Sequence, residues 1–166
     1  MKVCDFNTGA LLLTLPVDDP QDVSVAFSPD GTRLVSVTFE GAATVWDAAS
    51  GKKVLVLEGL RGLDNTPHVV FSPDGRTIAV AISGGGDGHT KVWDAFTGHE
   101  LLNLPGWRVA FGPNDKYVAT ADGRTLRLFA LDVGDLLALA RKRVTRPLDS
   151  EECKRYFPGE DCPTMP

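Results

Sequence analysis

The sequence predicts an all-β protein built from repeats of short strands. The segment Phe-Ser-Pro-Asp-Gly at residues 27–31 recurs at residues 71–75, and in the weaker form Phe-Gly-Pro-Asn-Asp at residues 111–115, with offsets of 44 and 40 residues. A second motif, Val45-Trp46-Asp47, recurs as Val92-Trp93-Asp94. The 166 residues include 17 Gly and 11 Pro, a content typical of many strands joined by tight turns.

The runs around these motifs divide into four strands per repeat. Pro-Asp-Gly fixes φ at its first position and favours a positive φ at its last, so it closes an antiparallel hairpin. Apolar and polar side chains alternate beside it, with Val23, Val25 and Phe27 on one face. A Ser-Gly or Thr-Gly pair after each Trp-Asp closes the next hairpin. The predicted strands are 23–28, 33–39, 43–47 and 53–58, then 68–72, 77–83, 89–94 and 100–104, then 107–112, 117–122 and 125–129.

Four short strands in about 40 residues is the period of a propeller blade. With both motifs repeated in a fixed relation, residues 1–133 resemble the WD-repeat β-propellers, in the bacterial style. The resemblance implies blades in which each repeat supplies the outer strand of one blade and the inner three of the next. The repeats would span residues 10–51, 52–98 and 99–133, after an incomplete one. Because propellers close with roughly four to eight blades, about three blades predict a partial propeller that pairs with another copy or belongs to a longer protein.

Members of this family usually tie each blade together with a hydrogen-bonded tetrad of His, Ser or Thr, Asp and Trp. The positions that match this pattern are Trp46, Trp93, Ser36, Thr120, Asp87 and Asp122, beside the motif aspartates Asp47 and Asp94. No repeat carries the Gly-His that precedes the innermost strand, and Glu40 takes the carboxylate place in the first full repeat. We therefore expect the blades to depend more on apolar packing between them.

Residues 134–166 are predicted to form a short helical tail. Residues 135–144 consist mostly of good helix formers, with apolar side chains along one face. The tail is similar to the C-terminal end of large bacterial signalling proteins, in which a WD-repeat array follows a regulatory module. A cysteine pair recurs in those tails, so the resemblance implies that Cys153 and Cys162 could form a disulfide, although a reducing cytoplasm would keep both thiols.

No residue pattern points to catalysis, a metal or a cofactor. His68, His89 and His99 lie on separate predicted strands and loops, without the spacing of zinc ligands. The glycine-rich run at residues 84–91 lacks the Gly-Lys-Ser/Thr ending of a phosphate-binding loop, and no Gly-x-Ser-x-Gly motif is present. Trp107 stands at the position of Val23 and is expected in the blade core. We therefore expect no enzyme activity and no cofactor.

The charge distribution disfavours a nucleic-acid partner. The net charge of −5 lies wholly in residues 1–133, because residues 134–166 carry six basic and six acidic side chains. A phosphate backbone requires a basic surface. No run reaches the roughly 18 apolar residues of a spanning helix, so a membrane partner is not expected either. The start of the chain shows no signal peptide, which predicts a cytoplasmic location.

The sequence thus predicts a non-catalytic protein-interaction or sensing module, at the C-terminal end of a larger bacterial signalling or regulatory protein. Its partners would be the upstream domains, another protein or another copy. Loops at residues 59–67 and 84–89 are the candidate contact segments, because binding residues concentrate on loops held by a rigid scaffold. The candidate residues are Arg61, Asp64, Asn65, Asp87 and His89. The alternatives are a segment that self-assembles, with two copies completing a propeller, and, least favoured, a propeller enzyme.

Overall fold

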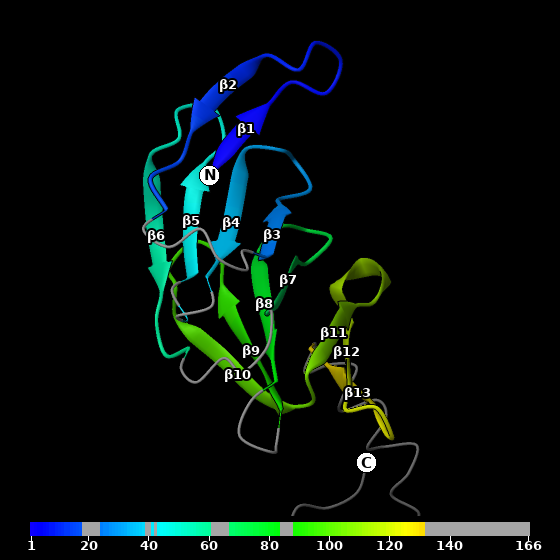
Figure 1. Ribbon diagram of the computed structural model, residues 1–166. Coiled ribbons are helices and arrows are strands. Elements are labelled where there is room, and N and C mark those ends of the chain that lie inside the picture. Colours follow the sequence, from blue (N-terminus) through cyan, green and yellow to red (C-terminus); the bar gives the residue numbers. More distant parts are fainter. Residues whose placement is uncertain (18–23, 39–40, 42, 61–66, 84–87, 132–166) are drawn as a thin grey trace, which may run out of the picture. The chain divides into compact units, whose positions relative to one another are not determined.

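The computed structural model describes residues 1–17, 24–38, 41, 43–60, 67–83 and 88–131. The described chain forms thirteen β-strands in four antiparallel sheets (Figure 1). The predicted all-β class is confirmed. The chain divides into two compact units, Met1–Phe129 and Ala130–Pro166, and the four sheets belong to the first, apart from the last residue of the final strand. The predicted helical tail, with Cys153 and Cys162, lies outside the described residues.

Two sheets are complete four-stranded blades whose strands lie side by side in chain order. The first comprises β3 (Ser24–Phe27), β4 (Arg33–Val37), β5 (Ala43–Asp47) and β6 (Lys53–Leu57). The second comprises β7 (His68–Phe71), β8 (Thr77–Ile82), β9 (His89–Asp94) and β10 (Glu100–Pro105). Every predicted strand boundary falls within two residues of the observed one, because local turn chemistry determines where each hairpin begins and ends.

The other two sheets are partial blades. The strands β1 (Lys2–Cys4) and β2 (Leu11–Thr14) form a two-stranded sheet. The third repeat forms β11 (Arg108–Phe111), the short 3-10 turn Pro113–Asp115, β12 (Tyr117–Ala121) and β13 (Leu126–Ala130). Cys4-Asp5 occupies the place of Trp46-Asp47 in the repeat, so β1 and β2 correspond to the two outer strands of a blade. The described sheets therefore form a partial propeller, as the sequence predicts.

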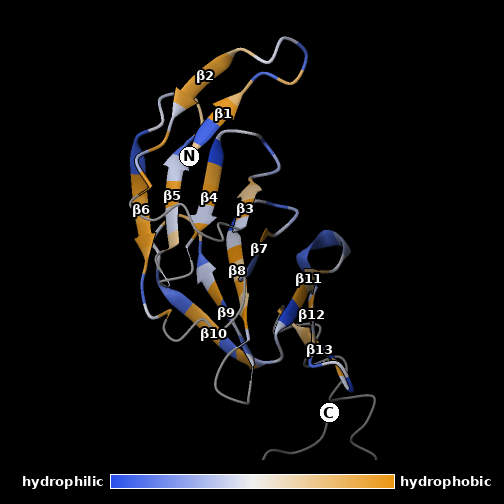
Figure 2. Ribbon diagram, viewed as in Figure 1, coloured by the Kyte–Doolittle hydropathy of each residue, from blue (hydrophilic) through white to orange (hydrophobic). Residues whose placement is uncertain are grey.

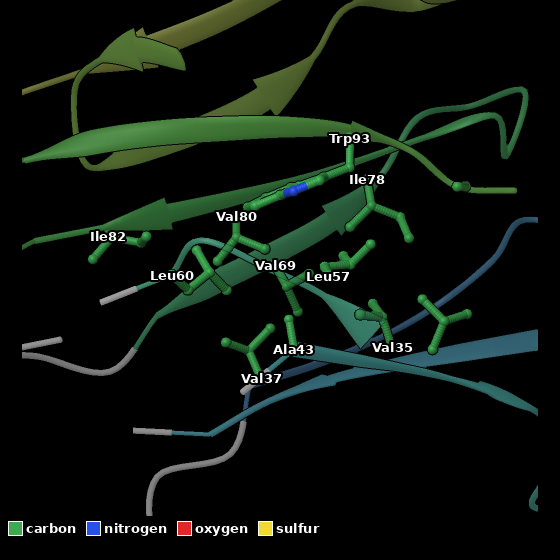
Figure 3. Close-up of a cluster of buried hydrophobic side chains, with 12 residues drawn as sticks. Val35, Val37, Ala43, Leu57, Leu60, Val69, Ile78, Val80, Ile82 and Trp93 are labelled. Atoms are coloured by element: carbon green, nitrogen blue, oxygen red, sulfur yellow. The ribbon is translucent and has the colours of Figure 1, made fainter. Parts of the chain in front are cut away.

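The main apolar core lies between the first and second sheets. Figure 3 shows these side chains facing one another across the interface. The buried members are Val35, Val37, Ala43, Val45, Leu57 and Leu60 on one side, and Val69, Ile78, Val80, Ile82, Trp93 and Ala95 on the other. All are at most 6% exposed, so the two sheets exclude water from the whole contact. Such burial stabilises a fold by roughly 25 cal/mol per Å² of apolar surface.

A second apolar cluster covers the opposite face of the first sheet. Leu34 and Trp46 of that sheet pack with Leu15, which follows β2, and with Val3 and Leu13 of the two-stranded sheet. The amino group of Met1 donates a hydrogen bond to the Leu15 carbonyl at 2.9 Å. The strand β2 supplies three consecutive leucines, and β6 is apolar after its first residue (Figure 2). The strands β4 and β5 are therefore buried on both faces.

Polar contacts link neighbouring sheets at their turns and inner strands. Arg33 Nη1 donates to the Ala95 carbonyl at 2.7 Å, across the first and second sheets. The Arg33 guanidinium also lies 4.4 Å from the centre of the Phe96 ring, a cation–π distance. The amide of Asp74 donates to Asp115 Oδ1 at 3.2 Å, across the second and third sheets. These contacts fix the sheets against one another at the end that carries the Ser-Pro-Asp-Gly turns.

Candidate interaction site

Three turns of the form Asp-x-x-Ser/Thr-Gly close the outer hairpins of the sheets. They start at Asp5, Asp47 and Asp94. In each turn the glycine amide donates to the carbonyl of the aspartate at 2.9 Å. The aspartate Oδ1 accepts from both the amide and the hydroxyl of the Ser or Thr three residues later. The glycines take φ between 68° and 73°, the left-handed region that favours glycine.

These hydrogen bonds lower the pKa of all three aspartate carboxyls below the ordinary value. The largest cause is the Thr8 hydroxyl for Asp5 and the Ser50 hydroxyl for Asp47. For Asp94 the largest cause is the Thr97 amide, followed by the Thr97 hydroxyl. The carboxylates stay ionised because their hydrogen bonds require an acceptor. In this geometry each aspartate side chain organises the turn that it begins.

The Ser-Pro-Asp-Gly turns are closed by side chains in the same manner. Ser28 Oγ donates to Asp30 Oδ1 at 2.6 Å and accepts the Arg33 amide at 2.9 Å. Ser72 makes the equivalent bond to Asp74 at 2.7 Å. The hydroxyl of Ser28, together with the Thr32 amide and hydroxyl, lowers the pKa of Asp30 to about 2. The polar groups at this end of the sheets are thus largely engaged within their own turns.

The two tryptophans of the Val-Trp-Asp motif have different surroundings. Trp46 Nε1 donates to Ser36 Oγ at 2.8 Å, and both residues are 2% exposed. In the second sheet Val80 takes the place of Ser36, and Trp93 lies beside it (Figure 3). The Trp93 indole N–H has no hydrogen-bond partner among the described residues, although the side chain is 1% exposed. Within the described part of the chain, one blade therefore carries an unpaired buried donor where its neighbour carries a hydrogen bond.

The third sheet uses its polar residues for other contacts. Thr120 Oγ1 donates to the Pro105 carbonyl at 2.6 Å, and the tryptophan position is occupied by Phe129. Asp122 accepts from the Arg124 and Thr125 amides in the turn between β12 and β13. Its other oxygen accepts from Arg127 Nη1 at 2.7 Å. The Arg127 bond, followed by the two amides, lowers the pKa of Asp122 to about 2.

The candidate loops are only partly described. Arg61, Asp64, Asn65 and Asp87 lie outside the described residues. His89 begins β9 and pairs with Ile82 and Pro105 on the neighbouring strands.

Within the described ranges, no group of three His, Cys, Asp or Glu side chains could hold a metal ion. The same described residues include no helix with the length and apolar character needed to cross a membrane.

A surface cavity of about 710 Å³ opens where the second and third sheets meet. Its lining includes Trp107, Asp122, Arg124, Thr125 and Arg127. Trp107 is partly buried and lines this cavity, in contrast to the core position expected from its alignment with Val23. Periodicity along one strand cannot locate this cavity, because its walls come from strand ends of two sheets. The cluster Asp-Gly-Arg-Thr-x-Arg at residues 122–127 is the sequence feature that marks it.

Two substitutions test the energetic role of the tryptophan bond. Ser36→Ala leaves the buried Trp46 N–H unpaired and should lower the free energy of unfolding by about 1–3 kcal/mol. Val80→Thr keeps the side-chain shape and offers Trp93 an oxygen, so it should raise the free energy of unfolding by about 1 kcal/mol. Urea unfolding followed by circular dichroism measures both. A neutral Ser36→Ala together with a destabilising Val80→Thr would contradict this assignment.

Comparison with known proteins identifies the repeats. Residues 9–47 and 61–94 match the family model described as WD domain, G-beta repeat. The chain is 32% identical over 115 residues to the small ribosomal subunit protein RACK1 of Caenorhabditis elegans, a match that covers 66% of this chain and 34% of the relative. It is 30% identical to the nuclear distribution protein PAC1 of Arthroderma benhamiae, with 99% of this chain and 41% of the relative covered. The chain thus spans between a third and about two fifths of the length of these two relatives.

Solved structures show a similar fold. The crystal structure of the computationally designed Ika4 protein superposes with a TM-score of 0.63 at 23% identity, covering 79% of both chains. Hydrazine synthase of Kuenenia stuttgartiensis gives a TM-score of 0.62 at 20% identity, covering 80% of this chain and 45% of the other. These likenesses concern the fold alone. The repeated turns, the stacked four-stranded sheets and the family match together show that this chain carries WD40 repeats at residues 9–47 and 61–94.

Proposed function

We propose that this chain is a non-catalytic protein-interaction module. Its WD40 repeats support this proposal, because WD-repeat proteins typically mediate contacts between proteins. The observation that carries it is the difference between the two ends of the sheets. At one end, the Ser-Pro-Asp-Gly and Asp-x-x-Ser/Thr-Gly turns satisfy their polar groups internally. The opposite end carries longer connections and the cavity beside Trp107.

The directions of the strand ends support the proposed contact surface. The connection from β6, which ends at Leu57, to β7, which begins at His68, leaves the end opposite the internally bonded turns. The connection from β8 to His89 of β9 leaves the same end. Loops that extend from a rigid scaffold can vary without disturbing the core, which suits them to partner recognition. The proposed contact residues are Arg61, Asp64, Asn65, Asp87 and His89.

The module would act within a larger bacterial signalling or regulatory protein in the cytoplasm. The similarity of residues 134–166 to the C-terminal tails of such proteins supports this setting. In that arrangement the proposed loops would bind either a regulatory domain of the same protein or a separate protein. Neither nucleic acid nor a membrane is among the proposed partners.

Affinity capture with two matched triple variants tests the interaction proposal. Arg61→Ala, Asp64→Ala and Asn65→Ala together should abolish retention of the partner that the wild-type protein captures. The control combines Asn7→Ala, Lys52→Ala and Arg76→Ala, which are exposed positions in turns at the other end. It should retain the partner, and thermal unfolding should show that both variants fold. Equal capture by both variants would refute the proposed surface.

Self-assembly is the second candidate function, and exposed apolar side chains favour it. Val25 and Phe27 on β3 are 48% and 55% exposed, on the face that the β1–β2 sheet covers over Trp46. Leu126 and Leu128 on β13 are 68% and 67% exposed. Leu126 and Leu128 correspond in the repeat to Ala43 and Val45 of the first sheet, whose face is covered by the second sheet. In the proposed assembly, the first sheet of one copy packs on the third sheet of another, as the second sheet packs on the first within one chain. This contact would cover Val25 and Phe27 of one copy and Leu126 and Leu128 of the other.

Light scattering across a range of protein concentrations tests this arrangement. The wild-type protein should reach at least the dimer mass, and Leu128→Glu should remain at the monomer mass because a charge cannot be buried without a partner. Leu101→Glu is the matched control, since Leu101 on β10 is 51% exposed outside the proposed contact. This control should assemble like the wild type. A monomeric wild-type protein at every concentration would rule out self-assembly.

A further inference from the structure

Trp107 occupies a space made for it by glycines from two sheets. A Cβ atom on Gly88, which precedes β9, would lie 2.5 Å from Trp107 Cβ and Cδ1. A Cβ atom on Gly123, in the turn between β12 and β13, would lie 3.5 Å from Trp107 Cζ2. The first distance is shorter than any real contact, so only glycine at position 88 permits this indole position. The indole therefore extends from the end of the second sheet to the end of the third.

The backbone around Trp107 is held in place by hydrogen bonds. The Gly106 amide donates to the Gly88 carbonyl at 2.8 Å, and the Trp107 amide donates to the Ala121 carbonyl at 3.0 Å. Thr90 Oγ1 donates to the Gly106 carbonyl at 2.7 Å. The backbone polar groups beside the indole are thus engaged, and the tryptophan is held before any ligand arrives. The indole N–H itself has no hydrogen-bond partner in the part of the chain that the structure describes.

In the cavity, arginine N–H groups remain available to donate hydrogen bonds, whereas both oxygens of the Asp122 carboxylate already accept them. Asp122 already accepts from the Arg124 and Thr125 amides and from Arg127 Nη1. Arg127 retains further N–H groups, because a guanidinium carries five. The Arg124 side chain forms no ion pair within the described residues, and the residue is exposed. The cavity therefore presents the Trp107 indole N–H, two guanidinium groups and the Thr125 hydroxyl, with one carboxylate whose oxygens are taken.

The electrostatic surroundings favour an anion at this place. Among the described residues that line the cavity, Arg124 and Arg127 carry a positive charge and only Asp122 carries a negative one. The Arg108 guanidinium, outside this lining, lies 5.2 Å from the centre of the Trp107 ring. The rest of the WD-repeat region is acidic, since the whole net charge of −5 lies in residues 1–133. A small positively charged site on an otherwise acidic protein attracts a single anionic group. The negative charge around it repels partners whose surfaces are strongly acidic. Guanidinium groups bind carboxylate and phosphate oxygens with paired hydrogen bonds.

We propose that the cavity lined by Trp107, Arg124, Thr125 and Arg127 binds an oxyanion carried by a peptide segment of the partner. The oxyanion is a glutamate or aspartate carboxylate or a phosphorylated side chain, placed against Arg124 and Arg127. An apolar neighbour in the same segment packs on the Trp107 indole. This inference rests on the proposed function and adds the chemistry of the partner to it.

Tryptophan fluorescence with synthetic peptides tests this site on the full chain. The chain has three tryptophans, and Trp46 and Trp93 are 2% and 1% exposed, so a ligand in the cavity changes mainly the emission of Trp107. The probes are Ac-Ala-Glu-Phe-Glu-Ala-NH2, its glutamine counterpart, and a version with phosphoserine in place of the first glutamate. The glutamate peptide should give a saturable change and bind roughly tenfold or more tightly than the glutamine peptide, with weaker binding at high salt. The ratio of the glutamate to the phosphoserine affinity identifies the source of the oxyanion.

Matched arginine variants complete the test. Arg124→Ala should weaken binding of the better anionic peptide roughly tenfold, because it removes a charged hydrogen-bond donor from an exposed position. Arg76→Ala, which removes an exposed arginine from the turn between β7 and β8, should bind like the wild type. Equal binding of the glutamine peptide, or an unchanged affinity for Arg124→Ala, would overturn the inference. If the peptides fail while the loop variant still loses its captured partner, this site is wrong and the interaction function stands.

Discussion

The blades of this chain carry apolar side chains on both faces, and each face requires another sheet to cover it. The first sheet meets this requirement on both sides, through the second sheet at Val35 and Val45 and through the β1–β2 sheet at Leu34 and Trp46. The strands β4 and β5 are buried for this reason. Stacking of sheets is thus the source of stability, and each blade depends on its neighbours in the way that repeat architectures do.

The turns divide the molecule into two chemically different ends. Serine, threonine and aspartate side chains bind the backbone of their own turns at one end, and Arg33 and Asp115 link adjacent sheets there. The polar groups at this end are therefore largely engaged in hydrogen bonds. The other end holds the longer connections and the Trp107 cavity, whose donors are only partly used. The repeated turn motifs therefore stabilise one end of the sheets through their own hydrogen bonds.

The sequence could predict the strands and turns because both depend on local chemistry. Pro-Asp-Gly and Asp-x-x-Ser/Thr-Gly each determine a hairpin within a few residues, so the strand boundaries follow to within two residues. The contact of Arg33 with Ala95 joins residues 62 apart, and no local pattern reveals it. The position of Trp107 is likewise not predictable from local sequence, because the space for its indole depends on Gly88 of another sheet. The absent Gly-His predicted weaker polar networks. The Trp93 indole beside Val80, which has no hydrogen-bond partner among the residues that the structure describes, is consistent with that prediction.

Equilibrium unfolding of two leucine variants tests most directly whether contact between stacked sheets holds the structure together. Leu57 on β6 is 1% exposed within the main core, whereas Leu101 on β10, also an outer strand, is 51% exposed. Leu57→Ala should lower the free energy of unfolding by about 2–5 kcal/mol. Leu101→Ala should change it by about 0.5 kcal/mol or less. Equal and small effects for both variants would show that the sheets do not depend on their mutual packing.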